Sequence, residues 1–421
     1  MKRPLRIAFL TPQFITEGLG TGGLGSYLYR ISRALRDLGH EVEVFLPFYH
    51  TGNKRPGPFD HDGIRVERVE PFDNIPLKVV NRLRLPQSFR MEQTYYLLRA
   101  ALGLAMALSR REDEKPFDAV QSSDVGFPGL FVKKSARRPL IVRCSWARDL
   151  WLKADGSPDV LDVRCVSRLE RMLVQRADIR YAPSNLVADH YSRHHGLNMK
   201  TLRPPFLLDA VPSNGLPWEL PKRFLLHFGT LGPIKGTDVL AEALPLVWRK
   251  EPDFAMVWAG QWRVWGPRGH EARPDLFDAC RRSWGARASQ VIWLGEIRKQ
   301  ELYAVLKKAE ATVLPSCCDN LPNTAIESLS LGIPVIGTKG SSIDELVEPG
   351  VSGEIVPAGD PAALAETMLK VWRGEVGWTG PSFRRPAILN AMEPSVAASN
   401  LIRLAGFDGC RECTASAAQM G

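Results

Sequence analysis

The chain has 421 residues, of which 44% are hydrophobic and 24% are charged, and its formal net charge is +9. This composition excludes a disordered or fibrous chain, and the length exceeds one typical core, so two domains are expected. A basic balance suits phosphate-bearing ligands, nucleic acid or an anionic membrane, although a solvated basic surface explains it equally well.

The N-terminus and the cysteines bear on location. The stretch MKRPLRIAFL is too short in its apolar part for a signal peptide and is expected to form a strand. The apolar-rich run 95–109 is interrupted by Arg99 and falls short of the roughly 20 residues that a membrane span needs. Seven scattered cysteines favour reduced thiols, and the lone pair Cys410 and Cys413 has no second pair to complete a zinc site. We expect a cytoplasmic protein, in part peripheral to a membrane.

The first half of the chain alternates strand-like and helix-like segments. The strand-like run LRIAFL precedes a loop containing Gly18, Gly20, Gly22, Gly23 and Gly25, and apolar residues then recur at helical spacing over 24–35. Further strand-like runs follow at 41–47, 117–121, 139–144 and 179–184. This alternation is typical of a parallel, doubly wound sheet.

The second half repeats the alternation after a Pro-rich linker over 202–221. Strand-like runs occur at 223–229, 254–260, 291–295, 311–315 and 334–338, and helices are expected from about 236 and about 361. The predicted fold class is therefore α/β, with two doubly wound Rossmann-like domains facing a cleft. We place the domains at 1–207 and 216–375, with a helix at about 380–407 crossing back onto the first domain and a tail at 408–421.

The glycine-rich loop contains G-T-G-G-L-G, one form of the dinucleotide fingerprint. Glycines let the backbone approach a ligand, and the following helix start attracts anions, although a merely flexible loop explains them too. The loop is long for a dinucleotide site, and the second strand lacks the expected acidic residue at its end. A dinucleotide-dependent oxidoreductase is thus a minor alternative.

Two further stretches carry candidate ligand-binding groups. In FGTLGPIKGTDVL, Lys235 precedes a helix start, where it can reach a phosphate or simply face solvent. In DNLPNTAIE, Asp319 and Glu327 flank Pro322, which suits a first helical position. Two carboxylates beside free helix amides suit a ribose and a hexose flanking a diphosphate; a loop cap and a first-turn charge are the structural alternative.

Together these stretches resemble the GT-B retaining glycosyltransferases of family 4, often called group 1 glycosyl transferases. The likeness runs from RIAFL to about Trp372 and is strongest over 313–356, which carries the family's E-x7-E pattern with Asp in the first place. The stretches LERMLVQRADIRYAPS and KGTDVL also match.

The resemblance implies a role for each candidate. Glu327 would hold the ribose of a nucleotide, Asp319 the hydroxyls of the donor sugar, and Lys235 the leaving diphosphate. The implied backbone contacts are the amides of Leu321, Asn323 and Thr324 to the sugar and diphosphate, the segment from Gly295 to Ile297 to the base, and Gly22 and Gly23 to the diphosphate.

The sequence departs from the family pattern at three places. Gly229-Thr230-Leu231 replaces the frequent G-R-L, so Thr230 stands where a phosphate-binding Arg is usual. Cys144, Ser145 and Arg148 occupy a strand end where the family often has His, and AVQSSD replaces another frequent His region. His190 and His194, four residues apart, are expected to be structural residues of a surface helix.

The sequence therefore predicts transfer of a sugar from a nucleotide diphosphate sugar to an acceptor hydroxyl with retention, by front-side attack, as the family implies. No metal cofactor and no nucleic acid are expected. The alternative is a nucleotide-sugar-binding protein with impaired catalysis. Trp262 and Trp265 either line the cleft or pack over the sheet. A patch of Arg90, Tyr95, Leu98, Arg99 and Leu102 either contacts anionic lipid or faces the core.

Overall fold

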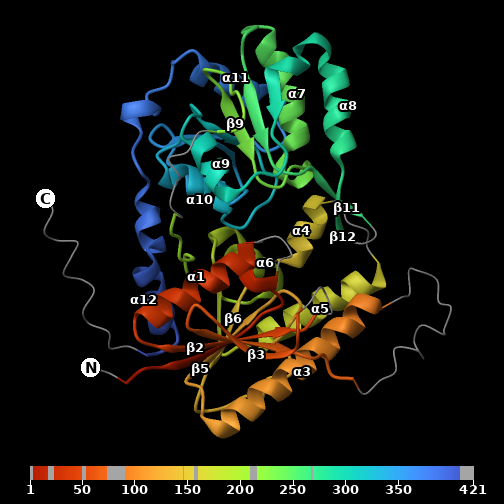
Figure 1. Ribbon diagram of the computed structural model, residues 1–421, viewed down its shortest axis with the longest axis vertical. Coiled ribbons are helices and arrows are strands. Elements are labelled where there is room, and N and C mark those ends of the chain that lie inside the picture. Colours follow the sequence, from red (N-terminus) through yellow and green to blue (C-terminus); the bar gives the residue numbers. More distant parts are fainter. Residues whose placement is uncertain are drawn as a thin grey trace, which may run out of the picture. The chain divides into compact units, whose positions relative to one another are not determined.

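The computed structural model describes residues 3–17, 23–49, 54–73, 91–145, 147–155, 160–208, 216–266 and 269–407. Two compact units divide the chain, each built around its own parallel sheet (Figure 1). The first unit comprises residues 1–150, 158–207 and 390–421, and the second comprises 151–157 and 208–389. Residues 151–157, which the predicted first domain includes, and residues 380–389 of the expected crossing segment belong to the second unit in this division.

The first unit contains an eight-stranded sheet of order β3-β4-β2-β1-β5-β6-β7-β8. Its strands are β1 (Arg6–Leu10), β2 (Glu41–Pro47), β3 (Gly57–His61), β4 (Ile64–Val69), β5 (Ala119–Ser123), β6 (Leu140–Arg143), β7 (Ile179–Ala182) and β8 (Lys200–Thr201). Its helices are α1 (Gly23–Asp37), α3 (Glu92–Glu114), the start of α4 (Arg148–Asp155), α5 (Leu161–Arg176), α6 (Asn185–His195) and α12 (Pro394–Leu404). All neighbouring strands run parallel except β3 and β4, so most strand ends that carry loops of interest share one edge.

The antiparallel pair of β3 and β4 was not anticipated from the sequence. Its turn places Asp62 at φ 52° and Gly63 at φ 72°, the left-handed conformations that a two-residue hairpin turn requires. The dipeptide Asp-Gly between two short strands is the signal that could have revealed it.

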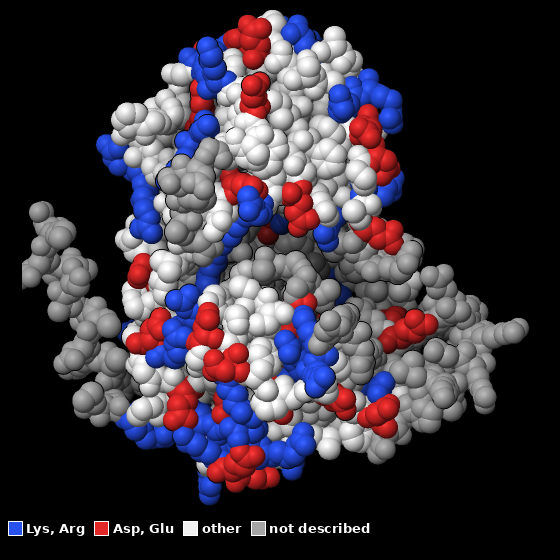
Figure 2. Space-filling view, viewed as in Figure 1, with Lys and Arg blue, Asp and Glu red and all other residues white. Residues whose placement is uncertain are grey.

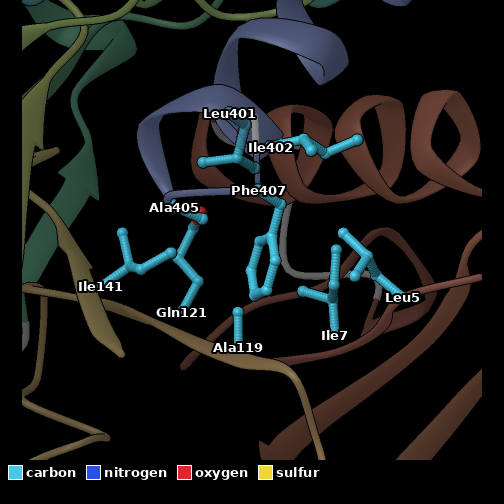
Figure 3. A pocket seen from close by; sticks show the side chains of 9 residues that line it. All are labelled: Leu5, Ile7, Ala119, Gln121, Ile141, Leu401, Ile402, Ala405 and Phe407. Carbon is cyan, nitrogen blue, oxygen red and sulfur yellow. The ribbon is translucent and has the colours of Figure 1, made fainter. Parts of the chain in front are cut away.

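The C-terminal helix α12 returns to the first unit, as the crossing helix was expected to do. It lies beside α1 and packs Ala398, Leu401 and Ile402 into the core of β1 and β2 (Figure 1). Figure 3 shows Phe407, just beyond this helix, pointing into a small apolar pocket over β1, β5 and β6. Gln121 is the one polar side chain among the residues lining that pocket, so the pocket marks a packing seam and offers little to a polar ligand. The helical part of the return is shorter than expected, because 3-10 turns and not α-helix precede Pro394.

The second unit contains a six-stranded parallel sheet of order β13-β10-β9-β14-β15-β16. Its strands are β9 (Leu225–Phe228), β10 (Met256–Ala259), β13 (Val291–Trp293), β14 (Thr312–Leu314), β15 (Val335–Thr338) and β16 (Gly353–Val356). Its helices are α7 (Thr237–Trp248), α8 (Pro274–Trp284), α9 (Lys299–Leu306), α10 (Asn323–Ser330) and α11 (Pro361–Trp372). β9, β10, β14 and β15 are buried throughout, as expected for strands covered by helices on both faces.

A separate two-stranded hairpin of β11 (Arg263–Gly266) and β12 (Gly269–Ala272) follows β10. Trp262, just before it, is 4% exposed and packs into the core with Trp258 at a ring distance of 6.1 Å. Of the two alternatives for Trp262, the structure shows packing. The side chain of Trp265 lies outside the described residues.

Among the described helices, none combines the length and apolar character that crossing a membrane requires. Helix α3 was expected to face lipid or the core. Arg90 lies outside the described residues, and the other four residues of that patch are half-buried. Leu98 packs against the core, and Arg99 donates to the carbonyl of Phe72 at 2.6 Å and pairs with Asp73. The core explanation therefore accounts for these side chains, and lipid contact stays a prediction.

Lipid contact can be tested by flotation with anionic vesicles. If it exists, the protein floats at low salt and is released at high salt, because ions screen exposed charges. Arg110→Glu, at an exposed position of α3, should then weaken flotation, whereas Arg282→Glu, at an exposed position of α8, should not. Absence of the wild-type protein from the floating fraction at low salt would exclude the contact.

Candidate functional site

Two loops of the second unit meet at the carboxyl edge of its sheet. One follows β9 over residues 229–236, and the other follows β14 over residues 315–322. Since β9 and β14 are parallel neighbours, both loops leave the same edge. Gly236 has φ 66°, and a Cβ atom there would lie 1.9 Å from the carbonyl oxygen of Pro315. Glycine is therefore required at this position for the two loops to touch.

The contact of these loops brings Lys235 to Asp319. The Lys235 ammonium is paired with Oδ2 of Asp319, with side-chain exposures of 25% and 9%. The other carboxylate oxygen accepts from the backbone N–H of Asn320 at 3.0 Å, and the Ser316 hydroxyl lies 3.5 Å from Oδ2. Lys235 and Asp319, which the sequence assigned to the diphosphate and the sugar, are thus in direct contact. Their charge pair is partly exposed and can be reached by a polar ligand.

The backbone between Asp319 and α10 is held in an unusual conformation. Leu321 and Ser342 both have positive φ, at 53° and 60°, which costs a non-glycine residue of the order of 1 kcal/mol or more. The Ser342 hydroxyl stabilises this arrangement, accepting from the N–H of Leu321 at 2.7 Å and donating to the carbonyl of Asp319 at 3.1 Å. The N–H of Leu321, expected to face the donor, already donates to the Ser342 hydroxyl in this structure.

Glu327 lies in the second turn of α10 and is buried. The Tyr303 hydroxyl donates to its Oε1 at 3.3 Å, and the Lys299 ammonium lies 3.7 Å from the same oxygen. Tyr303 itself is fully buried, so it fixes the position of the carboxylate. Both Lys299 and Tyr303 come from α9, and no local sequence pattern links them to Glu327.

A buried histidine orders the loop after β9. Nδ1 of His227 donates to the carbonyl of Val313 at 2.7 Å, and its Nε2 accepts from the hydroxyl of Thr237 at 2.9 Å. The same hydroxyl accepts from the N–H of Gly232 at 2.9 Å. Because the Val313 carbonyl can only accept, Nδ1 carries the proton of a neutral imidazole, which leaves Nε2 as the acceptor from Thr237. Burial, opposed by the Val313 hydrogen bond and aided by nearby Lys235, lowers the pKa of His227 to about 4.

Sequence reasoning found no histidine at a ligand-binding position and did not single out His227. It holds the loop that presents Lys235 and does not itself face the candidate ligand site, since its side chain is buried. Thr237, directly after the Lys-Gly pair, is the local sequence signal for this network, because its hydroxyl joins His227 to the N–H of Gly232 in the loop.

The remaining donor-binding candidates of the second unit lie on neighbouring loops. Thr230 is exposed, next to Gly229, whose Cβ atom would come within 2.9 Å of Thr324. Gly295 has φ 67°, and its carbonyl accepts from the N–H of Gly260 at 2.6 Å, while Ile297 follows half-buried. Asn323 and Thr324 occupy the first turn of α10 and are half-buried. These groups follow strands of one sheet, so they share its edge with Lys235.

In the first unit, Gly22 lies outside the described residues and Gly23 begins α1. Ser145, in the usual place of a histidine, donates its N–H to Asp124 at 2.8 Å, and its hydroxyl contacts Nη1 of the buried Arg143. Cys144 is buried in the core, where desolvation raises its pKa well above the usual value. Of the three residues at this strand end, Cys144 is thus turned away from any ligand.

Arg148 is fixed by a buried ion pair. Its guanidinium donates two hydrogen bonds, of 2.7 and 2.6 Å, to Glu170, whose Oε1 also accepts from the N–H of Gly126 at 2.9 Å. Planar two-point contacts of this kind are rigid and specific. Arg148 therefore supports the loop that carries Ser145.

Comparison with known proteins identifies the class. Residues 222–373 match the family described as "Glycosyl transferases group 1", and residues 22–203 match the "Glycosyl transferase 4-like domain". These matches leave uncovered only the linker and the two ends. The chain belongs to the group 1 glycosyl transferases, enzymes of the glycosyltransferase class with the GT-B fold.

Relatives and solved structures agree with this assignment. A D-inositol 3-phosphate glycosyltransferase of Thermobispora bispora is 26% identical over 395 residues, which is 87% of each chain. The sucrose-phosphate synthase structure from Thermosynechococcus elongatus superimposes with a TM-score of 0.64 at 15% identity, covering 95% of this chain and 94% of that one. Anabaena Alr3699/HepE in complex with UDP-glucose gives 0.58 at 18% identity, covering 95% of each. The two structures show the shared fold.

The His227 network predicts a pH dependence of stability. The folded pKa of about 4 lies below the ordinary 6.5, so the unfolded chain takes up a proton first as the pH falls. The free energy of unfolding should thus decrease between about pH 6.5 and pH 4, by up to about 3 kcal/mol.

Urea unfolding followed by tryptophan fluorescence measures this free energy at each pH; Trp258 reports on the region, since its ring and that of His227 are 5.7 Å apart. His227→Gln should flatten this dependence, whereas His194→Gln, at an exposed position, should leave it unchanged; equal slopes for His227→Gln and wild type would contradict the assignment.

Proposed function

We propose that this protein transfers a sugar from a nucleotide diphosphate sugar to an acceptor hydroxyl with retention of the anomeric configuration. The observation that carries the proposal is the convergence of Lys235, Asp319 and Glu327 at one edge of the second sheet. A lysine and two carboxylates around a helix start match the chemistry of a nucleotide diphosphate sugar: two sets of hydroxyls with a dianion between them.

The donor is bound at both ends through carboxylates. Glu327, held by Tyr303 and Lys299, accepts hydrogen bonds from the ribose hydroxyls. Asp319 accepts from hydroxyls of the transferred sugar, and the segment 295–297 lies against the base. Hydrogen bonds to ionised acceptors are roughly twice as strong as neutral ones, which suits a site that must recognise many hydroxyls.

The leaving diphosphate is stabilised by Lys235 and by the first amides of α10, at Asn323 and Thr324. In the donor-free protein Asp319 neutralises Lys235, so the diphosphate competes for the ammonium as the donor binds. A charge that develops on the diphosphate in the transition state then meets a fixed positive group, which lowers the barrier. We propose that no metal takes part in this step, since the lysine and the helix start supply the positive field.

Front-side attack, in which a donor phosphate oxygen takes the acceptor proton, follows from the resemblance to retaining family members. Ser145 can hydrogen-bond a hydroxyl but carries no charge, so no His-like ionisation near neutral pH should arise from this position.

The choice of first substrates comes from similar proteins. Anabaena Alr3699/HepE was solved with UDP-glucose, and the Thermobispora bispora relative is named for an inositol phosphate acceptor. We therefore propose UDP-sugars as the first donors to test and phosphorylated polyols as the first acceptors. Lys and Arg side chains are interspersed with Asp and Glu over the described residues of the visible face, and a nucleic-acid site would need a basic patch or stripe (Figure 2).

Loss of the Glu327 carboxylate should weaken donor binding. Glu327→Ala is expected to reduce nucleoside diphosphate affinity by roughly 1–3 kcal/mol, the range for a lost charged hydrogen bond. Isothermal titration with UDP, GDP, ADP and dTDP first identifies the nucleotide and then measures the variant. Glu366→Ala, on the exposed face of α11, is the matched control and should bind normally. A folded Glu327→Ala protein with wild-type affinity would refute the ribose contact.

Removal of Lys235 should affect turnover more than binding. Lys235→Ala is expected to lower kcat by a larger factor than it raises KM, because its contact with the diphosphate strengthens as charge develops. Steady-state kinetics with the identified donor measures this, with Lys250→Ala, an exposed residue after α7, as the control. Normal turnover in Lys235→Ala would remove this residue from the site.

Measurements on the same purified wild-type protein test both the stereochemistry of transfer and the alternative of impaired catalysis. NMR of the product anomer distinguishes retention from inversion, and an inverted product would overturn the mechanistic class. Donor binding without turnover on any acceptor would instead identify a nucleotide-sugar-binding protein that has lost catalysis.

A further inference from the structure

A second cluster of ligand-type side chains lies wholly within the first unit. Asp149, at the start of α4, faces His190 and His195 at the end of α6. Its two carboxylate oxygens each lie 3.0 Å from one histidine nitrogen, Oδ1 from Nε2 of His190 and Oδ2 from Nε2 of His195. All three candidate ligand atoms lie within 4.8 Å of one another. The sequence analysis noted His190 and His194; in the structure it is His195, and not His194, that lies beside His190 and Asp149.

We propose that Asp149, His190 and His195 form a binding site for a divalent transition metal of the Zn²⁺ type. Two imidazole nitrogens and one carboxylate oxygen are ligands that such ions accept, whereas Mg²⁺ and Ca²⁺ require oxygen ligands. Ligands about 2.0–2.2 Å from a tetrahedral ion lie roughly 3.3–3.5 Å apart. The two nitrogens lie 3.0 Å from different oxygens of Asp149 and the three ligand atoms lie within 4.8 Å of one another, so side-chain movements would be needed to bring them onto one ion.

The hydrogen-bond geometry of His190 points to a ligand. Its Nε2 is buried and lies 3.0 Å from the carboxylate, yet it makes no hydrogen bond of acceptable geometry. The nitrogen is thus close to Asp149 but is not aimed at its oxygen. A lone pair directed at an ion shared with Asp149 accounts for both observations. Without an ion the two histidines act on the carboxylate directly: burial would raise the pKa of Asp149, but hydrogen bonding and charge from His190 and His195 lower it.

Exposure and the surroundings define the kind of site. The side chains of His190 and His195 are 12% and 11% exposed, and that of Asp149 is 46% exposed. Metal can enter from solvent, and a water molecule can complete a tetrahedral set. The N–H of Leu150 also donates to Oδ1 of Asp149 at 3.2 Å, which holds the carboxylate in place.

One neighbour opposes metal binding. Nη1 of Arg171 lies 3.5 Å from Nδ1 of His195. A histidine that binds metal through Nε2 carries a proton on Nδ1, so a guanidinium donor there must withdraw. Arg171, half-buried on α5, therefore limits the affinity of the site, and its removal should tighten binding.

The position of the site indicates its role. Asp149 is adjacent to Arg148, which anchors the loop of Ser145 through Glu170. A metal joining Asp149 to the end of α6 would fix the start of α4 and, with it, this loop. The site is a structural brace, and its existence does not depend on the proposed transfer reaction, whose donor-binding side chains Lys235, Asp319 and Glu327 belong to the other unit.

The test uses the full chain without a purification tag, freed of metal by a chelator and titrated with ZnCl₂ against a chromophoric chelator. We expect one site per chain at micromolar zinc, and we expect MgCl₂ not to compete. His195→Ala and Asp149→Ala should each weaken zinc binding by about 10–100-fold or more. His194→Ala is the matched control, since His194 is exposed on the same helix end and outside the set, and it should bind zinc as the wild type does.

Two further measurements keep the proposal falsifiable if a variant folds poorly. Co²⁺ bound to the wild-type chain should give the visible absorption of a tetrahedral site, and this spectrum should be lost in His195→Gln. Arg171→Ala, which leaves all three ligands intact, should tighten zinc binding several-fold. Failure of the wild type to bind zinc at micromolar concentration, or unchanged binding in a folded His190→Ala/His195→Ala double variant, would overturn the proposal.

Discussion

The close approach of two loops at Gly236 and Pro315 is the constraint on which the candidate donor site depends. A side chain at position 236 would place its Cβ atom 1.9 Å from a carbonyl oxygen, so only glycine allows the loops after β9 and β14 to touch. This contact joins Lys235 to Asp319, which are 84 positions apart in sequence. The pairing of these two charged side chains therefore results from the packing of two loops and not from one contiguous sequence motif.

Buried polar groups hold this arrangement because each has a partner. His227 and Thr237 bind one loop from below, and the Ser342 hydroxyl accepts from one residue and donates to another in the second loop. In a low-dielectric interior an unsatisfied polar group is costly, so such networks fix a single geometry when complete. The strained backbone of Leu321 persists for the same reason. Rigidity of this kind suits a site that must hold charge in place as a diphosphate leaves.

The first unit holds polar groups near its strand ends in a different way. After β6 it uses a long charged side chain fixed by an ion pair, that of Arg148 with Glu170. A buried ion pair gives specific geometry when all its hydrogen bonds are made, and breaking one leaves an uncompensated charge. Two of the three departures from the family pattern fall in this unit, where Ser145 is held by Arg143 and Cys144 is buried; the third, at Thr230, lies in the second unit. The proposed metal site would hold the loop of Ser145 at a further place, Asp149, in addition to the Ser145–Arg143 and Arg148–Glu170 contacts.

The sequence by itself determined the alternation of strands and helices, the start of α1 at Gly23, and the placement of Asp319 and Glu327 on either side of a helix start. These follow from local periodicity and from the backbone preferences of glycine and proline, which act over a few residues. Only the tertiary structure decided that Lys235 pairs with Asp319, that Ser342 occupies the N–H of Leu321, that Tyr303 holds Glu327, and that His190 meets Asp149 and His195. Local reasoning noted that His190 and His194 are four residues apart and expected both to be structural, because it considered one helix only. Such pairings depend on strand order and on which helices lie beside one another, and these are fixed by burial of apolar surface over the whole unit, which no short stretch of sequence records.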